Sequence, residues 1–198
     1  MTGRAAAGAC WERGRPRPHS ANVRELRTLP FPRGAGGVAP RPRAIGAQPL
    51  TPDPAPVAAF DLVEELHSAF DPQLMEKKLH WHADVPPECQ TIVVHSDLLR
   101  IVLKNLIENA VRFTPAGGQV SVSFRLEADA VAIEVADDGC GIPEEELPRV
   151  FERFYQVARS RSGADRGTGL GLSIVRHAVS AMGGRINLES RVGAGTRV

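Results

Sequence analysis

Asn105, Asn109 and Arg112 recur at intervals of four and three along one stretch of the sequence. In an α-helix this spacing places the three side chains in one strip. Amide oxygens bind divalent cations, and a guanidinium is a planar donor for phosphate oxygens. The strip could therefore hold a metal-bound phosphate, although polar residues at the border of an amphipathic helix are also common without any ligand.

Asp137 closes a run, residues 131–137, in which valine and isoleucine alternate with other residues. The period of two in a β-strand puts its carboxylate on the apolar face. A buried carboxylate needs a donor, and Gly139 and Gly141 would let a ligand approach the backbone closely. The amino group of adenine is such a donor, whereas guanine would present an oxygen. The same residues also suit an ordinary turn.

A glycine-rich segment opens the last helical pattern and reads Gly167-Thr168-Gly169-Leu170-Gly171-Leu172. Free backbone amides and the helix dipole would favour an anion there, most simply phosphate. A polar loop precedes the segment where a dinucleotide-binding fold needs a strand, and the Gly-Lys-Ser/Thr signature is missing. The aromatic cluster at residues 151–155 could anchor a lid over a ligand through Phe154, although Phe151 suits an ordinary core position equally well.

The strip around Asn105 requires a helix, and apolar residues at 3.6-residue spacing predict one over residues 96–113. Ser96 or Asp97 should cap its start, and Thr114-Pro115 should stop it. Upstream, large apolar residues at every fourth position from 62 to 74 predict a helix. Because a proline interrupts this helix at position 72, we expect it to be bent or divided.

A last helix is predicted over residues 170–182, ended by Gly183-Gly184. Alternating or apolar runs predict strands over residues 79–82, 91–94, 119–126, 130–136 and 185–190. The third and fourth of these runs flank a short acidic turn and should form an antiparallel hairpin. The fold class expected is α/β, a two-layer sandwich in which helices back a mixed, mostly antiparallel sheet.

Residues 1–56 differ from the rest of the chain in composition. They contain ten of the sixteen prolines, and nine arginines against three acids, a charge of about +6. With so few large apolar residues we expect this segment to be disordered, and the folded domain to cover residues 57–198. The overall charge of +1 leaves the domain acidic, which argues against nucleic acid as its partner.

Three cysteines, Cys10, Cys89 and Cys140, are odd in number and form no Cys-x-x-Cys pair, so neither a disulfide framework nor a zinc site is predicted. No apolar run approaches the roughly 18 residues that span a bilayer. The expected location is the cytoplasm, either independently or as the cytoplasmic part of a membrane sensor.

These motifs together resemble the ATP-binding catalytic domain of sensor histidine kinases, within the superfamily that includes DNA gyrase, Hsp90 and MutL. Residues 105–114 look like the N box of the family and residues 137–143 like its G1 box. Residues 151–155 are similar to its F box, and residues 167–172 to its G2 box. The fold implied is the Bergerat type.

By that resemblance, Asn109 would hold Mg²⁺ against the phosphates of ATP, assisted by Asn105 and Arg112. Asp137 would accept from the adenine amino group. The residues expected to line the nucleotide are Asn105, Asn109, Arg112, Asp137, Gly139, Gly141, Ile142, Phe154, Gly167, Thr168, Gly169, Leu170, Gly171 and Leu172.

The reaction implied is transfer of the γ-phosphoryl group to a histidine. ATP-hydrolysing members of the superfamily have Glu at the position of Asn105, which favours transfer over hydrolysis. Glu108 is a possible base, but it should point further outward on the helix. The partners implied are a phosphoacceptor histidine domain and a response regulator. A homodimer is expected only if another region supplies the contacts.

Two features depart from the family. Its phosphoacceptor motif, His-Glu-Leu-Arg-Thr-Pro, has only a faint counterpart at residues 24–28, with arginine in place of the histidine. The sequence also stops at Val198, within the last strand of the family, so we expect that strand to be truncated and the sheet to lack an edge. A stand-alone regulatory module, similar to anti-sigma-factor kinases or degenerate kinases, and a gyrase-type ATPase remain alternatives.

Overall fold

The computed structural model describes residues 53–128, 130–157 and 167–198. Five strands of this part form one sheet in the order β2-β4-β5-β7-β6, and two more form a separate ribbon, β1-β3. The sheet strands are β2 (His80–Asp84), β4 (Gln119–Leu126), β5 (Val131–Asp137), β6 (Glu189–Arg191) and β7 (Gly195–Arg197). The ribbon strands are β1 (Ala55–Ala58) and β3 (Thr91–Val94).

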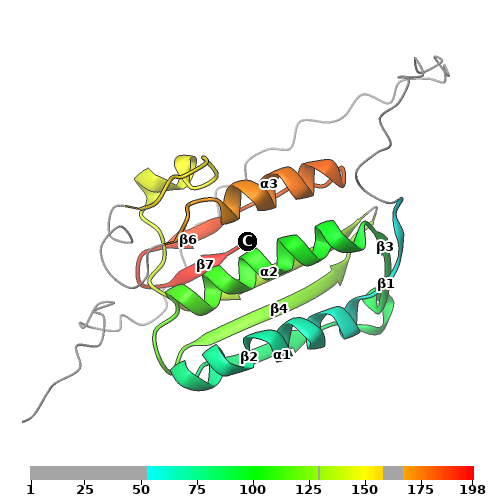
Figure 1. Ribbon diagram of the computed structural model, residues 1–198, viewed down its shortest axis with the longest axis horizontal. Helices are drawn as coiled ribbons and strands as arrows, with labels where there is room; N and C mark the ends of the chain where they lie inside the picture. Colours follow the sequence, from blue (N-terminus) through cyan, green and yellow to red (C-terminus); the bar gives the residue numbers. More distant parts are fainter. Residues whose placement is uncertain (1–52, 129, 158–166) are drawn as a thin grey trace, which may run out of the picture. The chain divides into compact units, whose positions relative to one another are not determined.

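The helices are α1 (Ala59–Lys77), α2 (Ser96–Phe113) and α3 (Gly171–Ala181), with short 3-10 turns η1 (Pro87–Cys89) and η2 (Glu144–Arg149). Figure 1 shows the three α-helices side by side across one face of the sheet. Within the sheet β2 pairs with β4 in parallel, and the other pairs are antiparallel. The predicted two-layer sandwich with a mixed, mostly antiparallel sheet is therefore confirmed.

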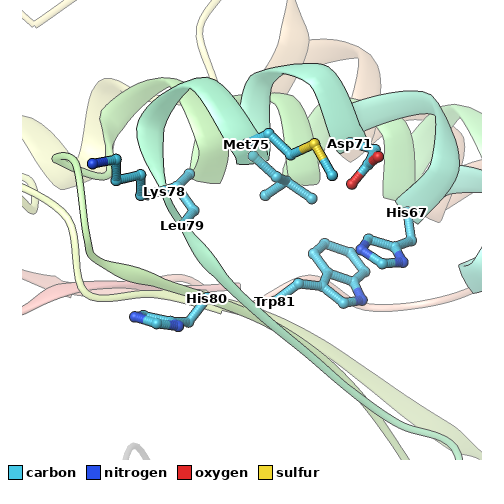
Figure 2. Close-up of a pocket in the computed structure, with 8 residues that line it drawn as sticks. His67, Asp71, Met75, Lys78, Leu79, His80 and Trp81 are labelled. Carbon is cyan, nitrogen blue, oxygen red and sulfur yellow. The ribbon is translucent and has the colours of Figure 1, made fainter.

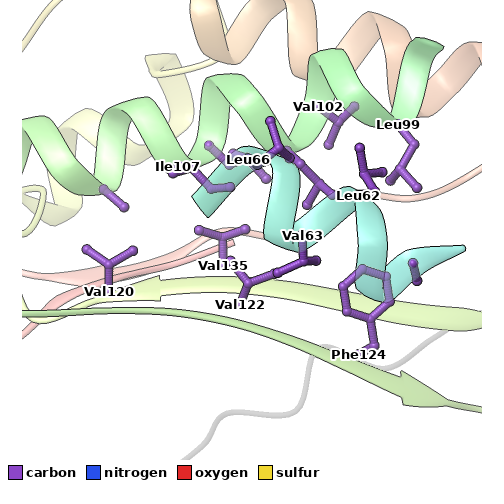
Figure 3. Packing of buried hydrophobic residues seen from close by; sticks show 14 of the residues in the cluster. Leu62, Val63, Leu66, Leu99, Val102, Ile107, Val120, Val122, Phe124 and Val135 are labelled. Atoms are coloured by element: carbon purple, nitrogen blue, oxygen red, sulfur yellow. The ribbon is translucent and has the colours of Figure 1, made fainter. Parts of the chain in front are cut away.

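α2 is the central element of the helix layer, and most of its apolar face is buried. Leu103 and Ile107 have no exposed surface, and α2 lies between α1 and α3 on the sheet (Figure 1). Figure 3 shows Val102 and Ile107 of α2 beside Leu62 and Leu66 of α1. Each large apolar side chain buried in this way contributes about 1.5–3 kcal/mol to folding. This burial sets the rotation of α2 about its axis, so that its polar strip must lie beside the core.

Of the two outcomes predicted for Pro72, a bent or a divided helix, division is wrong, because α1 continues from Ala59 to Lys77 with the proline inside it. Phe70 and Leu74 are buried on either side of Pro72. Their packing against the core keeps the helix continuous although one backbone donor is missing. The helix ends at Lys78, which adopts the left-handed conformation at φ 52°.

The start of α2 also differs from its prediction. The helix begins at Ser96, but His95 occupies the N-cap position and no side chain forms a capping hydrogen bond. Ser96 and Asp97 lie inside the first turn, where the carboxylate of Asp97 instead interacts favourably with the helix dipole.

The C-terminal strands differ from the predicted ones in length and position. Residues 185–188 are not in a strand, because the chain uses them to pass from the helix layer to the edge of the sheet, where β6 begins. The last strand, β7, lies between β5 and β6 and is not at an edge. Val198 exchanges two backbone hydrogen bonds with Val135, each 3.0 Å from nitrogen to oxygen.

β1 begins at Ala55, so the first two residues of this strand fall within the segment predicted to be disordered. Residues 1–52 and the polar loop 158–166 lie outside the described residues. Of the helices in the described residues, none has both the length and the apolar character needed to cross a bilayer.

Candidate functional site

The polar strip of α2 faces the start of α3. A Cβ atom added to Gly171 would lie 3.2 Å from Asn105 Oδ1 and 3.8 Å from Asn109 Nδ2. A Cβ atom added to Gly167 would collide with the guanidinium of Arg112. The missing side chains therefore let the glycine-rich segment approach the strip closely, and all three residues of the strip meet it.

The side chains of the strip have different partners. Asn105 Nδ2 donates to the carbonyl of Ile101 at 2.8 Å, which leaves its oxygen directed toward the start of α3. Arg112 Nη2 donates to Glu108 Oε1 at 2.9 Å. The side chain of Glu108 is about half exposed, as its outward position on the helix predicted. Glu108 is thus an ion-pair partner on the solvent side of the strip.

The first turn of α3 is suited to an anion. Leu170 occupies the N-cap position, no side chain forms a capping hydrogen bond, and the turn contains no acidic residue. Thr168 Oγ1 accepts from the amide of Leu170 at 3.3 Å. Leu172 packs partly buried against the core. The helix is therefore anchored by its apolar side, while the positive end of its dipole faces the strip of α2.

Phe154 contacts the glycine-rich segment through its backbone. Its amide donates to the carbonyl of Gly169 at 2.8 Å, and both residues have positive φ angles, 64° and 69°. A Cβ atom at Gly169 would lie only 2.6 Å from the carbonyl carbon of Phe154. The Phe154 side chain is 73% exposed, so it is not a core residue. The predicted lid itself lies in the loop outside the described residues.

Asp137 lies at the end of β5 with its carboxylate largely withdrawn from water. The pKa of this carboxyl is raised to about 6, chiefly by burial and to a smaller extent by the neighbouring charge of Asp138, while hydrogen bonds from the backbone amides of Gly139 and Thr196 oppose the rise. The Gly139 amide donates to Asp137 Oδ1 at 2.8 Å. The carboxylate is thus partly buried on the face that the strand pattern predicted, with backbone amides as its donors.

The loop after Asp137 is tied to the end of α2. The Cys140 amide donates to the carbonyl of Phe113 at 3.2 Å. A Cβ atom at Gly139 would lie 2.6 Å from the same carbonyl oxygen. The loop that follows Asp137 therefore contacts the end of the same helix that carries the polar strip.

Gly141 and Ile142 contact the C-terminal hairpin of the sheet. Gly141 has φ 68°, and its backbone lies so close to the carbonyl of Arg191 that a side chain would collide with it. The Ile142 amide donates to Ser190 Oγ at 2.8 Å. Ile142 also lines a cavity of about 870 Å³ between η2 and β6. Gly141 therefore contributes a structural contact, and Ile142 borders a space that a ligand could enter.

A smaller cavity of about 340 Å³ lies between α1 and β2 (Figure 2). His67 and Trp81 stack there with ring centroids 5.1 Å apart. Its lining includes none of the residues that the sequence motifs single out. The motifs thus converge elsewhere, at α2, α3 and the loop after β5.

Two contributors to the site were missed by sequence reasoning. Thr196 stands opposite Asp137 in the β5–β7 pairing, and its amide is one of the donors to the carboxylate. Lys77 donates to three carbonyls at the end of α2. The only signal for Thr196 was the pair of glycines before it, Gly193 and Gly195. A lysine at the end of an amphipathic helix carries no local signal at all.

The raised pKa of Asp137 predicts a pH-dependent cost to the fold. The pKa of Asp137 is about 6 in the folded protein and 3.8 is its ordinary value. The contribution of this carboxyl to the free energy of unfolding is therefore complete below pH 3.8 and is lost as the pH rises through 6. Asp137→Asn should therefore increase the free energy of unfolding at pH 7.5 by on the order of 1–3 kcal/mol, and by less at pH 4.5. Urea unfolding at the two pH values measures this, and an equal difference at both would contradict it.

Comparison with known proteins identifies the family of the chain. The model of the histidine kinase-, DNA gyrase B-, and HSP90-like ATPase family matches residues 94–198, more than half of the chain. The sensor histidine kinase WalK of Bacillus subtilis is 35% identical over 141 residues, which cover 70% of this chain and 21% of WalK. The chain thus spans about a fifth of the length of that relative.

Solved structures show the same fold. The catalytic domain of histidine kinase ThkA superposes with a TM-score of 0.63 at 25% identity, covering 73% of this chain and 91% of that one. Full-length ShkA in complex with AMPPNP superposes with a TM-score of 0.62 at 30% identity, covering 73% of this chain and 29% of that one. The chain therefore belongs to the histidine kinase-, DNA gyrase B- and HSP90-like ATPase family, and its domain is of the kind found in sensor histidine kinases.

Proposed function

We propose that this chain binds Mg²⁺-ATP and transfers the γ-phosphoryl group to a histidine of a phosphoacceptor domain. The observation that carries this proposal is the approach of the polar strip of α2 to the start of α3. Two amides and a guanidinium there face backbone amides at the positive end of a helix. This arrangement suits a triphosphate with its cation.

The nucleotide would lie with its base near Asp137 and its phosphates near Gly167–Gly171. The buried carboxylate of Asp137 would accept from the adenine amino group. The backbone of the glycine-rich segment, together with Arg112, would bind phosphate oxygens. Asn105 Oδ1 lies 3.2 Å from the position where a Cβ atom of residue 171 would be. This close approach fits a cation held between an amide oxygen and the phosphates.

Asn109 would be the principal ligand of Mg²⁺, with Asn105 beside it. The bound ion would neutralise charge that develops on the phosphates during transfer. Leu170, Leu172 and Thr168 would shape the phosphate-binding turn. Phe154 would border the lid through its backbone contact with Gly169.

Transfer is favoured over hydrolysis by the partners of the strip. Asn105 carries an amide, and its nitrogen is engaged by its own helix. Glu108 carries the carboxylate of α2 that is nearest in sequence to this strip, and Arg112 pairs with it on the solvent side. An amide is no general base and the Glu108 carboxylate is paired on the solvent side, so we expect neither group to activate a water molecule. No observation favours a stand-alone regulatory module.

The proposed partners are the phosphoacceptor domain and, downstream, a response regulator. Histidine kinase ThkA has been solved in complex with response regulator protein TrrA, which provides a precedent for the second partner in a protein of the same fold. The reaction consumes ATP, so we propose the cytoplasm as its location. A homodimer would form only through a further region.

The test combines the full 198-residue chain with Mg²⁺, radiolabelled ATP and a purified phosphoacceptor domain of WalK. We expect acid-labile, base-stable label on the acceptor and none on the chain alone, because no histidine of this chain has the acceptor context. Asn109→Ala should abolish the label, whereas Lys104→Gln, on the exposed side of α2, should not. Release of phosphate without label on the acceptor would instead support an ATPase, and label on the isolated chain would contradict the missing acceptor.

A further inference from the structure

Lys77, the last residue of α1, binds the end of α2 through its ammonium group. Lys77 Nζ donates to the backbone carbonyls of Val111 at 2.8 Å, Arg112 at 2.7 Å and Thr114 at 3.0 Å. An ammonium has three donors and no acceptor, so these bonds use its full capacity. The contact is partly buried and joins two helices far apart in the sequence.

The contact completes the hydrogen bonding at the end of α2. The last four carbonyls of a helix have no partner within the helix. Here the carbonyl of Ala110 accepts from Thr114, those of Val111 and Arg112 accept from Lys77, and that of Phe113 accepts from Cys140. A cation at this position also interacts favourably with the negative end of the helix dipole.

The same turn of α2 holds the loop that carries the buried carboxylate. Phe113 lies between two of the carbonyls that Lys77 binds, and its own carbonyl contacts both Cys140 and Gly139. Gly139 in turn donates to Asp137. Contacts thus run from the ammonium of Lys77 through one helical turn to the carboxylate.

The backbone of Lys77 strengthens this link. Its carbonyl accepts from the amide of Gly117 at 2.9 Å, which anchors the loop between α2 and β4. At the far end of that loop, the amide of Gln119 donates to Asp138 Oδ1 at 2.7 Å. The loop after β5 is therefore bound on two sides by segments that Lys77 itself fixes.

We propose that Lys77 is a positioning residue of the nucleotide site, which sets the alignment of Asp137 with the adenine amino group by fixing the last turn of α2. The inference rests on the proposed binding of ATP. Without the ammonium, three carbonyls would turn to water, the last turn would fray, and the carboxylate would lose its fixed direction.

The chain offers a matched control in the adjacent lysine. Lys78 follows the helix in the left-handed conformation and lines the cavity between α1 and β2 (Figure 2), whereas the hydrogen bonds to the end of α2 come from Lys77. Lys77→Met and Lys78→Met therefore remove the same charge one residue apart. Only the first removes donors from the end of α2.

The first measurement compares ATP with purine riboside triphosphate, which lacks the 6-amino group, by calorimetry on the full chain. We expect Lys77→Met to reduce the preference for ATP about tenfold and Lys78→Met to leave it unchanged. A merely structural role would weaken both nucleotides equally or lower only the melting temperature. Equal weakening of the two nucleotides would overturn the proposal.

The second measurement needs no nucleotide, so it separates this inference from the proposed function. Amide hydrogen exchange should accelerate at least tenfold at Gly139 and Cys140 in Lys77→Met, but not in Lys78→Met. If the wild-type chain does not bind ATP, the proposed function fails. Independently of that result, unchanged exchange at these amides in Lys77→Met would refute the coupling between Lys77 and the loop after β5. Should Lys77→Met not fold, Lys77→Gln keeps two donors without the charge and should give a smaller effect of the same kind.

Discussion

Asp137→Asn is expected to weaken ATP binding by about 10- to 100-fold, which corresponds to the roughly 1.5–3 kcal/mol of a hydrogen bond to a charged group. The carboxylate accepts only, whereas an amide presents a donor on one side to the adenine amino group. Its surroundings increase the effect, because burial weakens competition from water. Calorimetric titration of the full chain with Mg²⁺-ATP at pH 8 measures the loss.

The matched control for this substitution is Asp138→Asn. Asp138 is exposed and accepts from the amide of Gln119, a bond that an amide oxygen can also form. Its change should therefore leave ATP binding within about twofold of wild type, since an exposed side chain contributes little. Equal losses in the two variants would remove the assignment of Asp137 to adenine.

The pKa of Asp137 adds a second signature to the same site. Because the carboxyl titrates at about 6, ATP binding by the wild-type chain should weaken as the pH falls from 7.5 toward 5. In Asp137→Asn this part of the pH dependence of ATP binding should be absent, since an asparagine side chain does not titrate.

Gly169→Ala should produce the second large effect, a loss of ATP binding of at least tenfold. The residue has φ 69°, which costs an alanine on the order of 1 kcal/mol. Its new Cβ would also lie 2.6 Å from the carbonyl carbon of Phe154 and 2.8 Å from the carbonyl oxygen of Tyr155. Because these contacts are with backbone, the glycine-rich segment must move away from the aromatic cluster, and the phosphate-binding amides must move with it.

Gly183→Ala separates backbone strain from the collision. Gly183 has φ 73°, almost the same angle, but nothing lies within 4 Å of the position where its Cβ would be. The control should lower the melting temperature by a few degrees and keep ATP binding. Binding by Gly169→Ala at the wild-type level, with the fold verified by circular dichroism, would show that Phe154 and the glycine-rich segment need not touch.

Local patterns were sufficient for most of the elements. The 3.6-residue period of α2 placed Asn105, Asn109 and Arg112 in one strip, and the structure keeps them on one side of the buried face. The period of two in β5 put Asp137 on the apolar side of its strand, where it is desolvated. These predictions succeeded because each depends on residues within one or two turns of the chain.

Predictions that depended on context failed. Pro72 would divide an isolated helix, but burial on both sides of it keeps α1 continuous. Ser96 or Asp97 was predicted as the N-cap of α2, but His95 occupies that position, because the ribbon β1-β3 sets where the chain enters the helix. The strand predicted over residues 185–190 was shortened, because part of it has to connect two layers.

The sequence by itself determined the motifs, the polar strip of α2 and the side of β5 on which the Asp137 carboxylate lies. It also determined which glycines allow another group to approach the backbone closely. Only the tertiary structure decided which of these groups meet. It brought Gly171 against Asn105, Thr196 against Asp137 and the ammonium of Lys77 against the end of α2. The physical reason is that periodicity sets the direction of a side chain from its own element, whereas the partner it meets depends on how buried faces far apart in the sequence pack together.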